Sequence, residues 1–205
     1  MPRPRIHDLD AVLDAAELLA VQSGPASVTI RGVAATTGMS NGAIYHNFGS
    51  RAELLGRTWL RAATRFLDGQ KILVEEALAT AGPVDAVVAA ADAPAVLSEQ
   101  FPTSAALLLK VRRSDFLGDD VPTDIATAIA GTDKQLVDLM IRLSSNLWDR
   151  RDGHAVDVIT TCIVDLPTSV LLQRDRLHNP VAREHLRAAV RAVLAVGPPP
   201  RQKSK

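Results

Sequence analysis

The 205-residue chain has little of several features that proteins commonly use for stability or chemistry. Its single cysteine, Cys162, cannot form an internal disulfide, which is typical of proteins in a reducing cytoplasm. Aromatic residues make up only 3% of the sequence, although 47% of it is hydrophobic, so the core must consist mainly of Ala, Leu and Val. That composition favours helices over sheets.

Neither sign of charge predominates, because the formal net charge is zero. This balance argues against a nonspecific binder of polyanions, although it permits a local basic face. The start, MPRPRIHDLD, lacks the apolar core of a signal peptide. Asp85 and Asp92 interrupt the small-apolar run from Val84 to Ala93, which is far shorter than a membrane span. We therefore expect a soluble cytoplasmic protein that does not enter a membrane.

Patterns typical of an active site are also scarce. Among the five histidines only His178 and His185 approach a regular spacing, and seven residues on a helix separate them too far for an ordinary shared metal. Cys162 lies in an apolar setting without a neighbouring histidine, which indicates packing. No glycine-rich phosphate loop follows a strand, because the sequence has no strand pattern. We expect no metal, no cofactor and no enzymatic activity.

Apolar residues instead recur every three and four positions along most of the chain, which predicts helices. The first should end near Gly24, and a long one should run from Ser50 to Gly82-Pro83. Further helices are expected to begin at Pro94, Pro102 and Pro122 and after Gly131, with the last two at about 154–174 and 180–196. Pro167 should kink or divide the helix that contains it.

The stretch TTGMSNGAIYHNFGSR, residues 36–51, predicts a helix-turn-helix with helices at about 29–36 and 40–47. Gly38 suits a left-handed turn, and Ser40 suits a helix cap. Ala34 and Ile44 would supply the apolar contacts between the two helices. Gly42 should cost the second helix about 1 kcal/mol relative to alanine. Such a loss is tolerated more readily where a backbone approaches another molecule closely, and DNA is the natural candidate.

The segment VTIRGVAATTGMSNGAIYHNFGSRAELL resembles the TetR (tetracycline-repressor) family of bacterial transcriptional regulators, and the likeness runs from about Leu9 to Leu55. The resemblance implies an all-α protein with a three-helix DNA-binding head at residues 1–50. A helical-bundle body at 51–197 would bind an effector and form a homodimer, and the tail at 198–205 is expected to be disordered. The chain departs from the family pattern at Asn47, where histidine is frequent, and at Arg51, where lysine is commoner.

In a helix-turn-helix the first turn of the second helix usually meets base edges. Asn41 and Ala43 are therefore candidates for base contacts, and the resemblance favours phosphate contacts for Tyr45 and Arg51. The alternative for Tyr45 is a core aromatic. The full set of expected DNA-binding residues is Thr29, Arg31, Ser40, Asn41, Gly42, Ala43, Tyr45, His46 and Arg51.

Arg57, Arg61 and Arg65 form a basic stripe, for which a solvated face is favoured over DNA contact. Arg3 and Arg5 would form either an arm or an unstructured terminus.

The last two helices carry apolar stripes that we expect to form the dimer interface; the alternative is that they close the core of one chain. The residues expected there are Ile159, Ile163, Val170, Leu186, Val190 and Leu194. An apolar or weakly polar effector is expected inside the body. Its candidate contacts are Trp59, Phe66, Phe101, Phe116, Met140, Trp148, Cys162 and Asp165.

These features predict a regulator, by the family's usual mode a repressor, that leaves a palindromic DNA operator when a small molecule binds. The alternative is a helical DNA-binding protein of architectural or constitutive type, without an effector switch. Zero net charge and a body three times the size of the head argue against that alternative.

Overall fold

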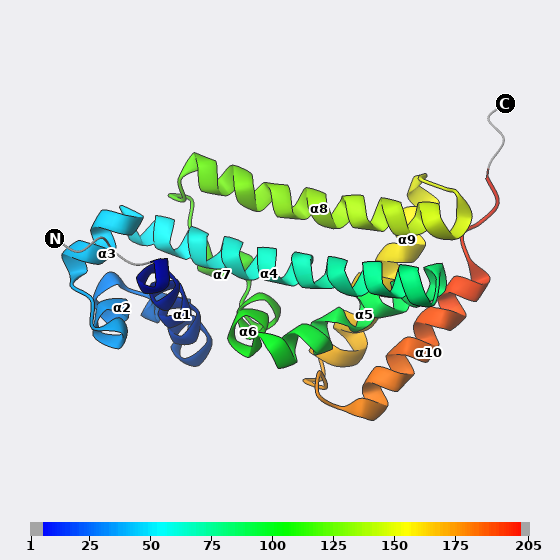
Figure 1. Ribbon diagram of the computed structural model, residues 1–205, viewed down its shortest axis with the longest axis horizontal. Helices are drawn as coiled ribbons and strands as arrows, with labels where there is room; N and C mark the ends of the chain where they lie inside the picture. The colour runs from blue at the N-terminus through cyan, green and yellow to red at the C-terminus, as the bar shows by residue number, and fades with distance from the viewer. Residues whose placement is uncertain (1–5, 202–205) are drawn as a thin grey trace. The chain divides into compact units, whose positions relative to one another are not determined.

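The computed structural model describes residues 6–201, and its fold is all-α (Figure 1). Residues 1–5, with Arg3 and Arg5, and 202–205 lie outside the described part. The helices are α1 (Ile6–Ser23), the 3-10 turn η1 (Pro25–Ser27), α2 (Ile30–Thr37), α3 (Asn41–Phe48), α4 (Arg51–Thr80), α5 (Pro83–Gln100), α6 (Pro102–Lys110), α7 (Arg113–Phe116), α8 (Thr123–Trp148), α9 (Gly153–Thr160), the π-helical turns η2 (Thr161–Asp165) and η3 (Thr168–Leu172), and α10 (Pro180–Val196).

The chain divides into two compact units. The first contains the N-terminal residues through Arg65 together with Phe101–Asp133, and the second contains Phe66–Gln100 together with the residues from Lys134 onward. The long helices α4 and α8 each contribute residues to both units. This division differs from the expected boundary between residues 50 and 51. That boundary, between a DNA-binding head and an effector-binding body, stays a prediction about function.

The core of the first unit joins α1, α2 and α3. Val12, Val33 and Ile44 are completely buried, and Phe48 is nearly so. The same cluster continues through the aromatic ring of Trp59 in α4 and into α7 and α8. Since these apolar side chains come from every helix of the unit, the three N-terminal helices have a fixed support.

A helix was expected to begin at Pro94, but Pro94 lies inside α5 and is buried. Proline lacks a backbone N–H, so the carbonyl of Ala90, four residues earlier, loses its helical donor. The Gln70 side chain of α4 replaces that donor, because its Nε2 lies 2.9 Å from the Ala90 oxygen. A tertiary hydrogen bond thus permits the proline inside the helix. Gln70 Oε1 is buried without a hydrogen-bond partner.

The expected helix start after Gly131 is also wrong, because α8 runs without interruption from Thr123 to Trp148. The Thr132 hydroxyl donates to the carbonyl of Ile129 at 2.6 Å, within the helix, and so does not act as a cap. Pro167 was expected to kink or divide its helix. It lies between η2 and η3, so the chain remains helical there with wider π turns.

The helical run Gly153–Leu172 is long and apolar enough to cross a membrane by length and composition alone. Within this run, a third of the most apolar 18-residue stretch is buried inside the protein. Core helices of soluble proteins meet the same criteria, so this run is weak evidence for a membrane. The apolar side chains that stay half-buried along it are Val156, Val158, Val164, Leu166, Val170 and Leu172.

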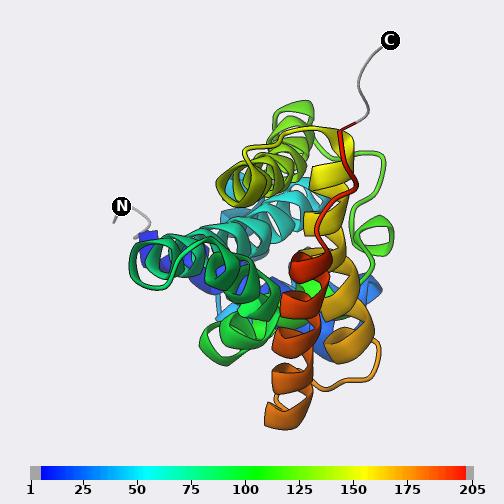
Figure 2. The ribbon, with the colours of Figure 1, turned by 90° about the vertical axis from the view of Figure 1, so that its right-hand side faces the viewer.

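Polar contacts connect α5 and α10, which pack side by side in the second unit (Figures 1 and 2). Both Asp92 carboxylate oxygens accept from Arg183, at 3.0 and 2.9 Å, and Oδ2 also accepts from Arg187 at 2.5 Å. Burial raises the pKa of Asp92, but the hydrogen bonds from both arginines lower it more, so its pKa lies below the ordinary value. Asp92 therefore remains ionised and paired at neutral pH.

Substitutions at Gln70 and Pro94 should be strongly coupled. We expect Gln70→Leu to lower the free energy of unfolding by about 1–3 kcal/mol, because the buried Ala90 carbonyl then has no donor. In a Pro94→Ala background the helix supplies its own N–H, so the same substitution should cost little. A double-mutant cycle by denaturant unfolding measures this coupling. Additive effects of the two substitutions would show that Gln70 does not compensate for the proline.

Candidate nucleic-acid interface

The turn between α2 and α3 has the backbone conformation that its sequence predicts. Gly38 has φ 73°, in the left-handed region, and its N–H donates to the Ala34 carbonyl at 2.9 Å. The Ser40 hydroxyl accepts from the N–H of Ala43 at 3.1 Å and so caps α3. Ile44 is fully buried and anchors α3 on α1 and α2. The predicted helix-turn-helix is therefore confirmed in its geometry.

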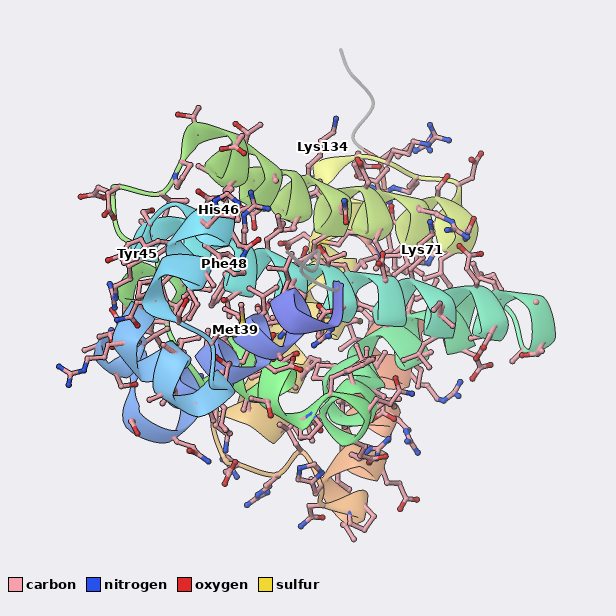
Figure 3. The ribbon with its side chains drawn as sticks, turned by 60° about the vertical axis from the view of Figure 1, so that its left-hand side comes forward. Met39, Tyr45, His46, Phe48, Lys71 and Lys134 are labelled. Carbon is pink, nitrogen blue, oxygen red and sulfur yellow. The ribbon has the colours of Figure 1, made fainter. Side chains whose placement is uncertain are left out.

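The residues expected to meet DNA are mostly exposed on this part of the first unit. Arg31, Asn41 and His46 are exposed, as are Thr29, Ser40 and Gly42, whereas Ala43 is half-buried. Tyr45 is 53% exposed, which excludes the alternative of a core aromatic. Figure 3 shows Tyr45 and His46 together on α3. The surface of α3 thus presents polar side chains to solvent, and their contacts with DNA remain a prediction.

Gly42 has no internal packing reason to be glycine. A Cβ atom built there would meet only the Ser40 hydroxyl oxygen, at 4.0 Å. Gly42 also lies within α3, where glycine is less favourable than alanine. The free space on its outer side is what a closely approaching backbone or base would occupy.

Asn47, one of the departures from the family pattern, turns toward its own helix. Its Nδ2 donates to the carbonyl of Ala43 at 2.7 Å, and the side chain is half-buried. This internal bond gives Asn47 a structural role in α3 that requires no phosphate.

Arg51 has internal partners that sequence reasoning missed. Its Nε donates to the Val28 carbonyl at 2.6 Å, and Nη2 donates to the Pro25 carbonyl at 3.0 Å. A cation in the first turn of α4 opposes the helix dipole, and a nearby phosphate was the expected explanation. The two carbonyls provide another explanation for a cation at this position. Through them, Arg51 holds the segment that contains η1 and leads into α2.

The stripe of Arg57, Arg61 and Arg65 is not a simple solvated face. Arg57 pairs with Glu53 at 2.7 Å within α4. Arg61 and Arg65 contact carboxylates of α1, among them the buried Glu17. These carboxylates lie far from Arg61 and Arg65 in sequence, so no helical periodicity within α4 reveals them.

The residues expected to bind an effector are divided between the two units. Trp59, Phe101 and Phe116 belong to the first unit, and the remaining five belong to the second. Trp59 and Phe116 are core residues with ring centroids 6.1 Å apart. Cys162 is fully buried, and burial raises the pKa of its thiol to about 12, so it is unreactive at neutral pH. Asp165 is exposed. The others in the second unit are Phe66, Met140 and Trp148.

Two cavities lie elsewhere, one in each unit, and neither is lined by the expected effector residues. A cavity of about 380 Å³ in the first unit is lined by Arg113, Ser114, Leu117, Gly118, Val121, Ala126 and Ile129. A cavity of about 400 Å³ in the second unit is lined by Leu67, Asp68, Lys71, Gln135, Asp138, Leu139 and Arg142. The first has mainly apolar walls, whereas four charged side chains surround the second. Figure 3 labels Lys71, one of these four.

Five of the six residues expected at a dimer interface are buried within one chain and so offer no surface to a partner. They are Ile159, Ile163, Leu186, Val190 and Leu194. The alternative, that these stripes close the core of the chain, therefore applies to them. Val170 alone remains partly exposed. Periodicity identified the apolar face of α10 correctly but did not indicate which surface covers it.

The sequence of residues 12–58 matches the family model described as "Bacterial regulatory proteins, tetR family". No curated protein matches the chain in sequence. A similar solved structure is a TetR-like regulator from Rhodococcus sp. RHA1, with 16% identity and a TM-score of 0.69, covering 95% of this chain and 99% of that one. A TetR-family regulator from Streptomyces coelicolor has 21% identity and a TM-score of 0.60, covering 93% of this chain and 99% of that one. The fatty acid degradation regulator FadR from Bacillus halodurans has 12% identity and a TM-score of 0.67, covering 93% of this chain and 96% of that one. At these identities the structural likeness establishes a shared fold.

Replacing Gly42 with alanine should separate stability from DNA binding. We expect Gly42→Ala to raise the free energy of unfolding by up to about 1 kcal/mol, since alanine favours the helix and its Cβ meets open space. The same methyl group should weaken binding to DNA by obstructing close approach. Thermal unfolding and electrophoretic mobility shifts measure the two effects. Unchanged DNA affinity would mean that no backbone or base approaches Gly42.

Arg51→Ala should lower the melting temperature of the protein in the absence of DNA, because the Val28 and Pro25 carbonyls lose their donors. We expect a loss of about 1–3 kcal/mol. Arg57→Ala is the matched control on the same helix, because its exposed pair with Glu53 should contribute at most about 0.5 kcal/mol. If both variants melt like the wild type, the bonds of Arg51 do not stabilise the head.

Proposed function

We propose that the chain is a DNA-binding transcriptional regulator and a cytoplasmic repressor, because residues 12–58 match the tetR-family model. As a homodimer it binds a palindromic operator through α3 and leaves it when a small molecule binds. The observation that carries the proposal is the helix-turn-helix with its exposed α3, which the first unit supports through a continuous core.

The energetics of sequence reading support a dimer. One good base contact provides about 1–3 kcal/mol of discrimination, whereas specific binding exceeds nonspecific binding by about 4–10 kcal/mol. Helix α3 has eight residues, and only its first turns are placed to meet base edges. Two copies of α3 on a two-fold symmetric operator reach the required range.

An exposed stripe of small and apolar residues on α10 supports the location of the dimer interface. Its members are Val181, Ala188, Ala192 and Val196, with the polar His185 among them, and all five residues are exposed. They recur every three or four residues, opposite the buried face of the same helix. Together with the half-buried apolar side chains of Gly153–Leu172, this stripe provides a surface that a second copy would remove from water.

The cavity of the first unit is the proposed effector site. Its mainly apolar walls suit the apolar or weakly polar ligand expected from the sequence. One wall is α7, which contacts η1, the turn that leads into the helix-turn-helix. Val121 in another wall lies 3.1 Å from the position that a Cβ would take on Gly56. A ligand there would act on α4 and η1 within the same unit.

Gly56 and Gly69 of α4 both lie in closely packed surroundings. A Cβ on Gly56 would lie 2.7 Å from a methyl carbon of Ile125, and one on Gly69 would lie 2.3 Å from a methyl carbon of Leu97. Both contacts are shorter than packing allows, so each glycine lets a neighbouring helix or side chain approach α4. The proposed switch therefore moves α4 together with its neighbours.

Selection of bound sequences from random duplex DNA tests the proposed function. The result expected is an inverted repeat whose half-site centres are about 34–36 Å apart, or a multiple of one helical turn. A DNA-binding protein without a switch would also select a sequence, so thermal scans against a metabolite library complete the test. A pool without enrichment would contradict the proposal.

Charged substitutions on the exposed α10 stripe should dissociate the dimer without unfolding the chain. We expect Ala188→Glu with Ala192→Glu to sediment as a monomer, to keep the melting temperature of the isolated chain and to lose operator binding. Ala79→Glu, at an exposed alanine of α4, is the control. Glutamates at Val190 and Leu194 would unfold the chain, because both residues are buried. A dimeric double variant would place the interface elsewhere.

A further inference from the structure

The most buried carboxylate of the first unit, Glu17 in α1, joins three helices. Its side chain is 2% exposed. Its Oε1 accepts from Arg61 of α4, with Nη2 at 2.8 Å and Nε at 3.2 Å. Its Oε2 accepts from the hydroxyl of Ser104 in α6 at 2.8 Å. Both oxygens are therefore hydrogen-bonded, as a buried charge requires.

Arg61 binds α1 at three successive turns. Besides Glu17, it donates to the Asp14 carboxylate at 2.7 Å and to the Asp10 backbone carbonyl at 3.1 Å. Residues 10, 14 and 17 lie on one face of a helix. A shift of α1 by one turn, about 5.4 Å, would break all of these bonds. The guanidinium thus fixes the position of α1 along α4.

Arg65 extends the same set of contacts to α6. Its Nη1 donates to the Ser104 hydroxyl at 3.1 Å, and that hydroxyl donates onward to Glu17. The Arg65 guanidinium also lies over the ring of Phe101, 5.4 Å from the ring centre. Ser104 is 4% exposed, so water contributes little to this chain of bonds. We call Glu17, Arg61, Arg65 and Ser104 the Glu17 network.

Such a network is a weak source of stability but a strong restriction on geometry. Removing water from a carboxylate offsets much of what its ion pairs contribute, and apolar residues of similar volume often stabilise a protein as well. Apolar contacts are non-directional and tolerate sliding. Hydrogen bonds to one carboxylate require particular distances and angles. The Glu17 network therefore specifies where α1 lies on α4 and α6.

We propose that Glu17 is a positioning residue for DNA binding. It fixes α1 on α4 and α6, and through the contacts of α1 with α2 it fixes the direction in which α3 is presented. In a dimer this direction determines which spacing of half-sites both heads engage at once. The inference rests on the proposed DNA-binding function.

The test separates positioning from stability. In Glu17→Met with Arg61→Met, two unbranched apolar side chains of similar length replace the central ion pair. We expect this double variant to melt close to the wild type and to tolerate half-sites respaced by one base pair. It should bind the selected operator at least about tenfold more weakly, which is the effect of losing one good contact per site. Glu17→Gln alone should melt lower, because Arg61 loses its buried counter-charge.

Two single variants provide a milder comparison. Ser104→Ala removes the α6 hydroxyl that bonds to both Glu17 and Arg65, and it should weaken operator binding and relax the preferred spacing. Asp14→Asn alters a contact on the exposed side of Arg61, because the Asp14 side chain is 63% exposed. This variant should leave operator affinity and the preferred spacing unchanged.

Wild-type affinity and spacing preference in the double variant, or equal behaviour of Ser104→Ala and Asp14→Asn, would overturn the proposal. A double variant that melts far below the wild type would show that the network serves stability instead. A wild-type protein that selects no DNA sequence would refute the regulator function itself, which is a different outcome.

Discussion

The presentation of α3 depends on one backbone conformation, the left-handed turn at Gly38. That turn directs Ile44 into the pocket formed by α1 and α2, where the side chain is completely buried. Because Ile44 occupies the inner face of α3, Tyr45 and His46, one and two residues further along, turn toward the outer surface. Asn41 is exposed at the first position of the helix. A side chain with a Cβ is strained at this φ value, so a different turn residue would change the angle between the helices. The whole candidate interface follows from this turn and the core beneath it.

A chain with so few aromatic residues has limited means to fix one helix against another by shape. Ala, Leu and Val pack closely, but their contacts permit sliding and rotation. Buried polar contacts supply the missing directionality in both units. In the first unit Glu17 joins three helices, and Arg51 holds the segment before α2. In the second, Gln70 satisfies the carbonyl that Pro94 leaves without a donor, and Asp92 joins α5 to α10. Each of these bonds connects residues far apart in sequence.

Local signals explain which parts of this structure were predictable. The caps at Thr29 and Ser40 and the turn at Gly38 depend on residues within one or two turns of each other, and the structure confirms all three. Pro94 and Gly131 were read as helix boundaries by the same local rules, but tertiary contacts and a continuous helix override them. The internal partners of Arg51 and the burial of the α10 stripe were not predicted, for a related reason. A periodic pattern shows that a face is covered, whereas only the fold shows whether the same chain or a partner covers it.

The central claim is that two copies of α3, held by the core of the first unit, read DNA from one face. Hydroxyl-radical footprinting of the wild-type protein on its selected operator tests this claim most directly. The account predicts two protected patches related by two-fold symmetry, with centres about 10–10.5 base pairs apart or a multiple of that distance. Protection should be lost in both patches together when effector is added. A single patch, or protection spread evenly along the duplex, would contradict it.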